Sequence, residues 1–413
     1  MSFRVKPETQ RTKLTLPQKS KAHITLQWSF LLFVLFSITQ ENDDLFRAFY
    51  FIGIIPSTVY ILIKDRFYQT ASSGIFLTNI LLLSVLYASI YWSLPPINTS
   101  EIMRYTRWFM ETAIFFTAIY VYARLGLHKT TTHGYLIQLS VILSTIISIT
   151  TYIKHSEFPA RMTGPGLLDD IIPGSSIIVV LWAISLTGLN LRDRRDILLS
   201  LTSLILVTAY TILNQSRAPL GVAALAWLVI ILIILKEIKA RTLAATIITS
   251  VAITLITLTS SDFSIIIHKM QERGMSYRPA IWEATLSNYK EFFWHGIGIG
   301  TSMSETKIGY AIEEAIGVRH NHPHNLFLSV WVHGGILAFG LITFTFLSLA
   351  YQTTRMALKN KNYIYLWILV ALIGVCLTDP YRLIGSPQEF YLFFWTPLGI
   401  LCGSLAQPHR LSR

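Results

Sequence analysis

The sequence predicts an all-α polytopic membrane protein with about 12 transmembrane helices and a large outer loop between helices 9 and 10. Of its 413 residues, 52% are hydrophobic and 14% are charged, whereas a soluble domain carries roughly 25% charged residues. The hydrophobic residues gather in long runs, and a helix needs about 20 of them to cross a bilayer. The basic residues lie in alternate loops between these runs, which is a topological signal. The net charge of +12 therefore indicates membrane orientation, and we expect no nucleic-acid partner.

Residues 1–22 are polar and basic and are predicted to form a cytoplasmic tail. Twelve apolar runs follow, at about 24–40, 45–64, 75–94, 107–124, 135–153, 173–190, 197–214, 219–235, 242–260, 325–350, 362–379 and 388–405. The predicted division is therefore 23–260 for helices 1–9, 261–324 for a periplasmic helical loop that carries the active site, 325–405 for helices 10–12, and 406–413 for a second cytoplasmic tail.

The charges support this count, because basic residues in short loops stay on the inner side of the membrane. The predicted inner loops contain Lys64, Arg66, Arg124, Lys129, Arg192, Arg194, Arg195, Lys236, Lys239, Arg241, Arg355, Lys359 and Lys361. The predicted outer loops contain Glu41, Asp43, Asp44, Glu101, Glu157, Asp169, Asp170 and Asp379. A count wrong by one helix would invert the pattern partway along the chain. We therefore expect both termini in the cytoplasm and the large loop outside.

Some arginines occur on the outer side against this bias, namely Arg161, Arg217, Arg278, Arg319 and Arg382. One interpretation is that they reach lipid headgroups with their long side chains. The other is an anion site, because guanidinium offers a planar fork of donors that matches phosphate. Pro219 and Pro279 suit the first turn of a helix. They predict that Arg217 and Arg278 lie at helix N-termini, where unpaired amides also favour an anion.

Acidic residues offer two further candidates. Asp169 and Asp170 follow the glycine-containing segment 161–166, and an acidic pair on the outer side is able to hold a divalent metal. A solvated loop is the interpretation that we favour for this pair. Asp379, in the last outer loop, is expected either to orient a histidine or to pair with Arg382.

Residues 319–325 contain three histidines at alternate positions, followed by the apolar run that begins near residue 325. Zinc or copper binding is one possibility, but Pro323 restricts the backbone between two of the ligands. We favour a single working base, His324. Pro323 is expected in the first turn of helix 10, and a helix N-terminus disfavours imidazolium and so keeps His324 neutral. His322 is expected to contact substrate beside it.

Several arginines, helix N-termini and a neutral histidine on one face suit the removal of a group from a pyrophosphate. Fixed cations stabilise the negative charge that develops on the leaving group without a metal. A histidine within hydrogen-bond reach of an incoming hydroxyl acts as a general base.

Three segments carry a resemblance to a known family. They are Arg278-Pro279-Ala280-Ile281-Trp282-Glu283-Ala284, Gly296-Ile297-Gly298-Ile299-Gly300-Thr301, and His322-Pro323-His324-Asn325 before an apolar run. Together they resemble the signature of the bacterial O-antigen ligase/polymerase superfamily, and Asn214-Gln215-Ser216-Arg217 resembles its turn before the following helix. The resemblance covers about residues 200–330.

This resemblance implies a fold similar to the GT-C class and a metal-independent, inverting glycosyltransferase of the bacterial inner membrane that needs no cofactor. The donor would be an undecaprenyl-pyrophosphate-linked glycan, the acceptor lipid A–core, and membrane lipids would surround the chain. Carried over by residue, His324 would be the base, Arg217 and Arg278 would hold the pyrophosphate, and Arg161 would assist. The remaining substrate-binding candidates are His322, Arg319, Asp379 and Arg382.

Other functions remain open. An O-antigen polymerase and a protein O-oligosaccharyltransferase belong to the same superfamily, and the large loop that contains Arg278 and His324 resembles the ligase more closely. A polysaccharide flippase would also explain the helices and the outer cations. Transporters usually place charges near the bilayer midplane and contain internal repeats, and we find neither pattern in this sequence.

Overall fold

The structure is a computed structural model and describes residues 20–64, 73–155, 158–237, 261–272, 277–377 and 382–406. Within these ranges it contains helices and no strand, which confirms the all-α prediction. The elements are α1 (Lys21–Thr39), α2 (Asp43–Ala48), η1 (Phe49–Ile54), α3 (Ile55–Lys64), α5 (Gly74–Ala88), η2 (Ser89–Trp92), α6 (Thr99–Arg124), η3 (Leu127–Lys129), α7 (Thr131–Lys154), η4 (Gly166–Leu168), α8 (Ile171–Ser185), η5 (Leu186–Gly188), α9 (Arg194–Asn214), α10 (Arg217–Glu237), α12 (Ser261–Glu272), α13 (Arg278–Ser287), η6 (Tyr289–Glu291), η7 (Met303–Glu305), α14 (Lys307–Ile316), α15 (Leu326–Asn360), α16 (Ile364–Cys376), η8 (Tyr391–Trp395) and α17 (Thr396–Leu405).

Several of these helices can cross a membrane. Seven described segments have the required length and hydropathy, namely Lys21–Thr39, Asp43–Lys64, Gly74–Trp92, Thr131–Lys154, Ile171–Gly188, Arg194–Asn214 and Leu326–Asn360. Shorter apolar helices occur at Arg217–Ile230, Ile364–Cys376 and Tyr391–Leu405, and α6 coincides with the predicted run at 107–124. The predicted run at 242–260 lies outside the described residues. The chain is therefore a multi-pass membrane protein.

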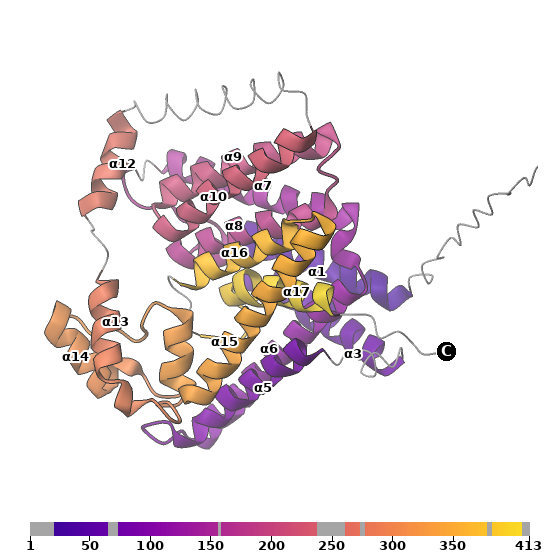
Figure 1. Ribbon diagram of the computed structural model, residues 1–413. Helices are drawn as coiled ribbons and strands as arrows, with labels where there is room; N and C mark the ends of the chain where they lie inside the picture. Colours follow the sequence, from indigo (N-terminus) through magenta and orange to yellow (C-terminus); the bar gives the residue numbers. More distant parts are fainter. Residues whose placement is uncertain are drawn as a thin grey trace, which may run out of the picture.

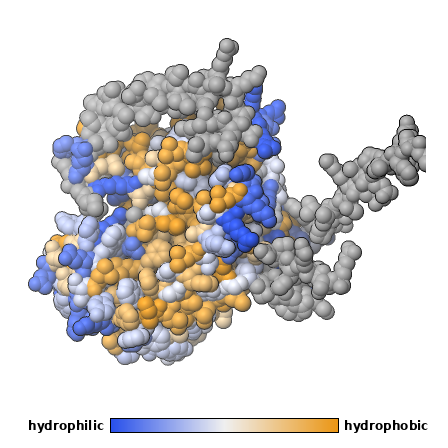
Figure 2. All heavy atoms as spheres, viewed as in Figure 1, coloured by the Kyte–Doolittle hydropathy of each residue, from blue (hydrophilic) through white to orange (hydrophobic). Residues whose placement is uncertain are grey.

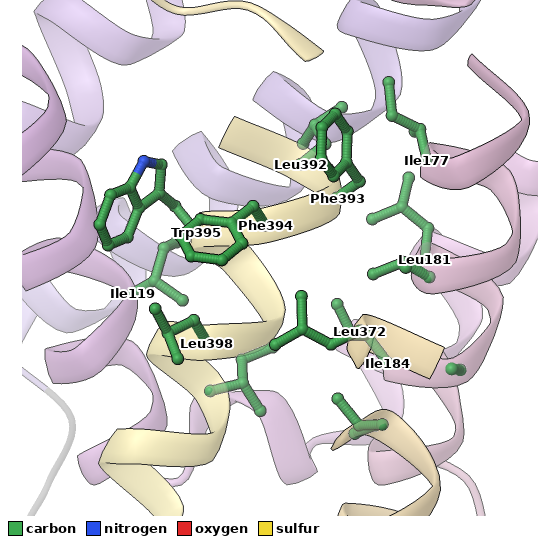
Figure 3. Packing of buried hydrophobic residues seen from close by; sticks show 14 of the residues in the cluster. Ile119, Ile177, Leu181, Ile184, Leu372, Leu392, Phe393, Phe394, Trp395 and Leu398 are labelled. Atoms are coloured by element: carbon green, nitrogen blue, oxygen red, sulfur yellow. The ribbon is translucent and has the colours of Figure 1, made fainter. Parts of the chain in front are cut away.

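The centre of the bundle is a dry core to which helices from distant parts of the sequence contribute. Figure 3 shows Ile177, Leu181 and Ile184 of α8 near Leu372 of α16, with the η8–α17 segment on the other side. These side chains are fully buried. Because lipid tails are as apolar as these side chains, close van der Waals packing rather than exclusion from water holds such helices together.

The outer surface of the bundle is apolar. Ile52 is 78% exposed and Ile63 is 73% exposed, although both lie on helices long enough to span a bilayer. Figure 2 shows hydrophobic residues across the middle of the visible face, with hydrophilic residues on the α13–α14 side and also at the opposite edge. Large contiguous apolar surface is rare on water-exposed monomers, so this belt is the surface that contacts lipid.

At one end of the molecule, α13 and α14 lie together beside the start of α15 (Figure 1). They share a small hydrophobic core of their own with those first turns, made of Ile281, Phe292, Met303, Ile308, Ile312, Leu328 and Val332. This core fixes α13 against the N-terminal turns of α15. The segment between α14 and α15, which contains the histidines, is held between them.

Helix α15 is broken at Gly335, where φ is 69° and ψ is −170°. Residues before α14 form hydrogen bonds to the backbone at this break. The amides of Ile297 and Gly298 donate to the carbonyls of Val332 and His333 at 2.8 and 3.0 Å, respectively. A side chain at Gly335 would meet the Trp294 carbonyl oxygen at 2.2 Å, so only glycine fits there. The glycine-rich segment 296–300 is therefore a close-packed turn that supports the start of α15.

Candidate active site

Arg161 is placed by a strong link between its loop and the turn that joins α9 to α10. The amide of Met162 donates to the Leu213 carbonyl at 3.1 Å, and the Asn214 side chain donates to the Met162 carbonyl at 2.8 Å. The guanidinium of Arg161 itself donates through Nε to the Asn214 carbonyl and through Nη2 to Ser216 Oγ, each at 3.0 Å. These contacts fix one edge of the guanidinium.

Arg217 is the first residue of α10, with Pro219 in the first turn, as the sequence predicts. The preceding Gln215 has a positive φ of 57°, which turns the chain sharply into the helix. The Arg217 side chain is exposed, and it reaches across to α12 and donates to the Met270 carbonyl. Arg217 therefore joins the α9–α10 turn to the large loop.

Arg278 is the first residue of α13, again with proline in the first turn, which confirms the prediction. One turn further on, the indole of Trp282 donates to the Pro323 carbonyl at 2.8 Å. Helix α13 thus supplies a cation and also holds the segment that contains the histidines.

The start of α15 differs from the prediction. The helix begins at Leu326 rather than at Pro323, because the Asn325 side chain caps it by accepting from the Leu328 amide at 3.1 Å. His324 lies before the cap with a left-handed backbone, at φ 51°. The prediction that Pro323 lies in the first turn of this helix was wrong, because the Asn325 side chain satisfies an amide of the first turn and so sets the helix start after His324.

Residues 320–324, here called the histidine segment, bring three imidazoles into contact. Nε2 of His324 lies 3.3 Å from Nδ1 of His320, within hydrogen-bond distance. The ring of His322 lies 4.1 Å, centroid to centroid, from the ring of His324. Burial, with a smaller effect from nearby His324, lowers the pKa of His320, so His320 is a neutral partner for His324 at pH 7.

These residues meet in one cavity of about 240 Å³, here called the first cavity. It is lined by Arg161, Ile172, Gln215, Ser216, Arg217, Ala218, Pro219, Tyr277, Arg278, Ile281, His320 and His324. Three predicted arginines and the predicted base therefore converge from segments far apart in the sequence. Ile172, Ala218, Pro219 and Ile281 give the cavity an apolar wall as well.

The other predicted residues lie elsewhere. Arg319 pairs with Glu313, Nε to Oε2 at 2.6 Å, and does not line the first cavity. His322 and Arg382 line a second cavity, which Asn321 of the histidine segment also lines. Asp379 lies outside the described residues.

The acidic pair is also separate from this site, since neither Asp169 nor Asp170 lines the first cavity. Gly164, Gly166 and Asp169 line a third hollow together with Glu41 and Asp43. Across the described ranges, no three His, Cys, Asp or Glu side chains are grouped so as to hold a metal ion.

Sequence reasoning missed His320, Gln215 and Tyr277 as members of the first cavity. Their positions depend on turns with positive φ, at Gln215 (57°) and Tyr277 (20°), and on the fold of the histidine segment. The one available signal was the spacing of His320 and His324, four residues apart in a segment that is not helical.

Comparison with known proteins finds similarity to one family. Residues 201–343 match the family model described as O-antigen ligase. The chain is also 26% identical over 388 residues to a protein of Pseudomonas aeruginosa named O-antigen ligase, and the similarity covers 92% of this chain and 89% of that protein.

The matched segment includes Arg217, Arg278, His320 and His324, which all line the first cavity. Arg161 reaches them from outside that segment through its bonds to Asn214 and Ser216. The family resemblance found in the sequence is thus confirmed.

Proposed function

We propose that the protein is an inverting glycosyltransferase that transfers a glycan from undecaprenyl pyrophosphate to lipid A–core. The observation that carries this proposal is the first cavity, where Arg161, Arg217 and Arg278 lie with His320 and His324 beside an apolar wall. The name of the Pseudomonas aeruginosa relative and the description of the family model support ligase activity over polymerisation.

The arginines suit a pyrophosphate. Undecaprenyl pyrophosphate is a polyanion joined to a long hydrocarbon chain, and guanidinium groups bind phosphate oxygens in pairs. Arg217 and Arg278 each lie at the start of a helix, where backbone amides add further donors. Ile172, Ala218, Pro219 and Ile281 would receive the first part of the lipid chain.

His324 would accept a proton from the acceptor hydroxyl. The oxygen of that hydroxyl forms a bond to the anomeric carbon of the glycan, from the side opposite the pyrophosphate. The bond between the anomeric carbon and the pyrophosphate oxygen breaks, and its electron pair leaves with undecaprenyl pyrophosphate. The arginines stabilise this charge as it develops, and neutral His320 stabilises the imidazolium formed on His324 by accepting a hydrogen bond from it.

The chain would lie in the inner membrane of a bacterium, with both termini in the cytoplasm and the first cavity on the periplasmic side. The charge alternation in the sequence supports this orientation. The same reasoning assigns residues 1–22 and 406–413 to cytoplasmic tails, residues 261–324 to the periplasmic loop and 12 helices to the membrane. The family resemblance supports a fold of the GT-C type.

The test is transfer of glycan by purified protein supplied with lipid-linked donor and lipid A–core, with and without a chelator. We expect His324→Ala to reduce transfer by about 10²–10⁴-fold, the usual contribution of a general base, and chelation to have no effect. His155→Ala is the matched control, because His155 is an exposed histidine that lines neither cavity.

Full activity in a folded His324→Ala variant would disprove the base role, and loss of activity with chelator would disprove the metal-independent reaction. Omitting lipid A–core tests the acceptor. If glycan chains then lengthen on undecaprenyl pyrophosphate, the protein is a polymerase.

A further inference from the structure

His324, the proposed base, has a backbone conformation that side chains disfavour. Its φ is 51°, in the left-handed region, where the Cβ atom of any residue other than glycine comes close to the following carbonyl oxygen. A residue persists in such a conformation only where surrounding contacts fix it. The contacts that hold the His324 backbone therefore decide where its imidazole lies.

One of these contacts comes from the side chain of His322. The backbone amide of His324 donates to Nδ1 of His322 at 3.4 Å. The bond spans two residues, as do the bonds that Asn and Asp side chains form with the backbone two residues further along the chain. With Nδ1 as the acceptor, the proton of the neutral ring is on Nε2. Nδ1 of His322 thus binds the backbone and not a ligand.

The peptide group between Pro323 and His324 is also held at its other end. The carbonyl oxygen of Pro323 accepts a hydrogen bond from the Trp282 indole at 2.8 Å. This carbonyl and the amide of His324 belong to one planar peptide unit. Rotation of that plane changes φ of His324, and bonds at both ends of the plane oppose the rotation. His322 and Trp282 together therefore fix the direction in which the His324 side chain leaves the backbone.

The chain on each side of this peptide is anchored separately. Ser302 Oγ donates to Asn321 Oδ1 at 3.1 Å. The Asn325 side chain caps α15 by accepting from the Leu328 amide, also at 3.1 Å. Neither of these bonds involves the peptide between Pro323 and His324. The bond from the His324 amide to His322 therefore supplies a constraint that the two anchors do not.

The rings of the histidine segment are also in contact. The His324 ring lies 4.1 Å from the His322 ring and 5.3 Å from the His320 ring, centroid to centroid. His320 and His324 line the first cavity, whereas His322 lines the second. Because His322 is not part of the lining that contains the three arginines, its effect on the reaction passes through His324.

We propose that His322 is a positioning residue for the proposed base. Its Nδ1 holds the peptide between Pro323 and His324 so that the His324 imidazole faces the first cavity, where it accepts a proton from the acceptor hydroxyl. His322 itself makes no bond to the reacting atoms. This role rests on the proposed function of His324, and it differs from the substrate contact that the sequence predicted for His322.

Asn and Gln at position 322 distinguish the two nitrogens of the ring. Oδ1 of Asn is bonded to Cγ, as Nδ1 of His is, whereas Oε1 of Gln lies one bond further out, near the place of Nε2. His322→Asn therefore keeps an acceptor for the His324 amide, and His322→Gln carries the same functional group in the wrong place. His322→Leu keeps an apolar side chain and has no acceptor.

The first measurement is steady-state transfer by the purified full-length protein, with lipid-linked donor and lipid A–core. His322→Gln and His322→Leu should lower kcat by roughly two- to tenfold, the effect of losing one neutral hydrogen bond. His322→Asn should retain most of the rate, and KM for the donor should stay unchanged in all three variants. His155→Leu is the matched control at an exposed histidine and should behave like the unaltered protein.

The second measurement is hydrogen exchange of the His324 amide, followed by NMR on protein with ¹⁵N-labelled histidine and without substrates. Exchange should be slow in the unaltered protein and in His322→Asn, and faster in His322→Gln and His322→Leu, because an amide that keeps its acceptor is protected. Melting temperatures establish that the variants are folded. The comparison of Asn with Gln decides the matter even if His322→Leu does not fold.

Equal kcat and equal exchange in His322→Asn and His322→Gln would overturn the proposal. A high rate in His322→Gln with a low rate in His322→Asn would also overturn it, because Nε2 would then be the nitrogen that acts. Exchange in the expected order, without transfer by the unaltered protein, would retain the positioning role and reject the ligase. Transfer by the unaltered protein, with exchange that is the same in every variant, would retain the ligase and reject the positioning role.

Discussion

The two cavities share the histidine segment as a wall but differ in charge and polarity. The first contains Arg161, Arg217 and Arg278 and an apolar side, whereas the second contains Arg382 among hydroxyl and amide groups. A pyrophosphate on a lipid needs several cations and an apolar surface. A sugar needs many hydrogen-bonding groups and few charges. The linings therefore suit ligands of different chemistry on the two sides of one segment of chain.

The arginines of the two cavities are also positioned in different ways. Those of the first cavity come from three segments that polar bonds tie together, such as the link from Arg161 to Ser216. Arg382 of the second cavity stacks on the ring of Trp108. In the first site, polar bonds bring several arginines together. In the second site, an aromatic ring contacts Arg382.

The largest expected effect is on the arginines of the first cavity. The double variant Arg217→Gln/Arg278→Gln should lower kcat for transfer by about 10³-fold or more, because each fixed donor to the leaving group contributes about 10²–10³-fold. The rate is measured with saturating lipid A–core.

Lysine at both positions is the informative control, because it keeps the charge and loses the planar fork. Partial recovery in the lysine variant supports pyrophosphate binding. If the double glutamine variant is folded and fully active, the arginines of the first cavity do not stabilise the leaving group, and the proposed difference between the cavities is rejected.

The next effect concerns His320, a positioning residue for His324. His320→Leu removes the ring nitrogen that lies 3.3 Å from His324 Nε2, and should lower kcat by about tenfold, the effect of losing one hydrogen bond to a charged group. KM for the donor should stay unchanged. His320→Gln keeps an acceptor and should restore most of the rate, an outcome that a merely structural role does not predict.

The pH dependence of stability tests the same residue. Burial lowers the pKa of His320 in the folded state, so the unfolded chain binds this proton more readily. The contribution of neutral His320 to stability is complete above the unfolded pKa of about 6.5 and is lost as the pH falls below it. Between pH 7 and 5, the melting temperature of the unaltered protein should fall further than that of His320→Gln. An equal fall in both proteins would contradict this assignment.

Much of this arrangement was predictable from the sequence. Hydropathy located the helices, and the alternation of charge drew attention to Arg161, Arg217, Arg278 and Arg382. Proline in a first turn correctly predicted the starts of α10 and α13. These features are local, since they depend on composition and on the residues next to each turn.

The remainder depended on contacts between distant residues. Nothing near Gly335 in the sequence shows that residues 293–298 form hydrogen bonds to the backbone where the helix is broken. The cap at Asn325 overrode Pro323, and it moved His324 out of the helix. Tyr105 of α6 bonds to Ile299 beside the second cavity, and Trp108 of α6 contacts Arg382. These partners are far apart in the sequence, so hydrophobic periodicity does not predict the contacts.

A smaller effect is expected at Trp282, whose indole holds the Pro323 carbonyl at 2.8 Å. Trp282→Phe keeps an aromatic ring and removes this bond, and should lower kcat by roughly two- to tenfold, as for one neutral hydrogen bond. Because the histidine segment is the wall of both cavities, KM for donor and acceptor should rise together.

Trp331→Phe is the matched control, since the Trp331 indole donates to the Phe293 carbonyl at 3.4 Å and not to the histidine segment. Steady-state kinetics with each substrate varied in turn make the comparison. If both variants lose activity equally, the bond from Trp282 has no special role in positioning His324.

The smallest effect is expected at Arg319, which the sequence placed among the substrate-binding residues. Its guanidinium stacks on Tyr310 at 4.0 Å and pairs with Glu313 at 2.6 Å, and it lines neither cavity. Exposed ion pairs contribute little to stability. Because substitutions away from a site usually change free energies by no more than about 0.5 kcal/mol, Arg319→Gln should change the rate and both KM values by about twofold or less, even though Arg319 precedes the histidine segment directly. A tenfold rise in KM for either substrate would show that a charge outside both cavities takes part in binding.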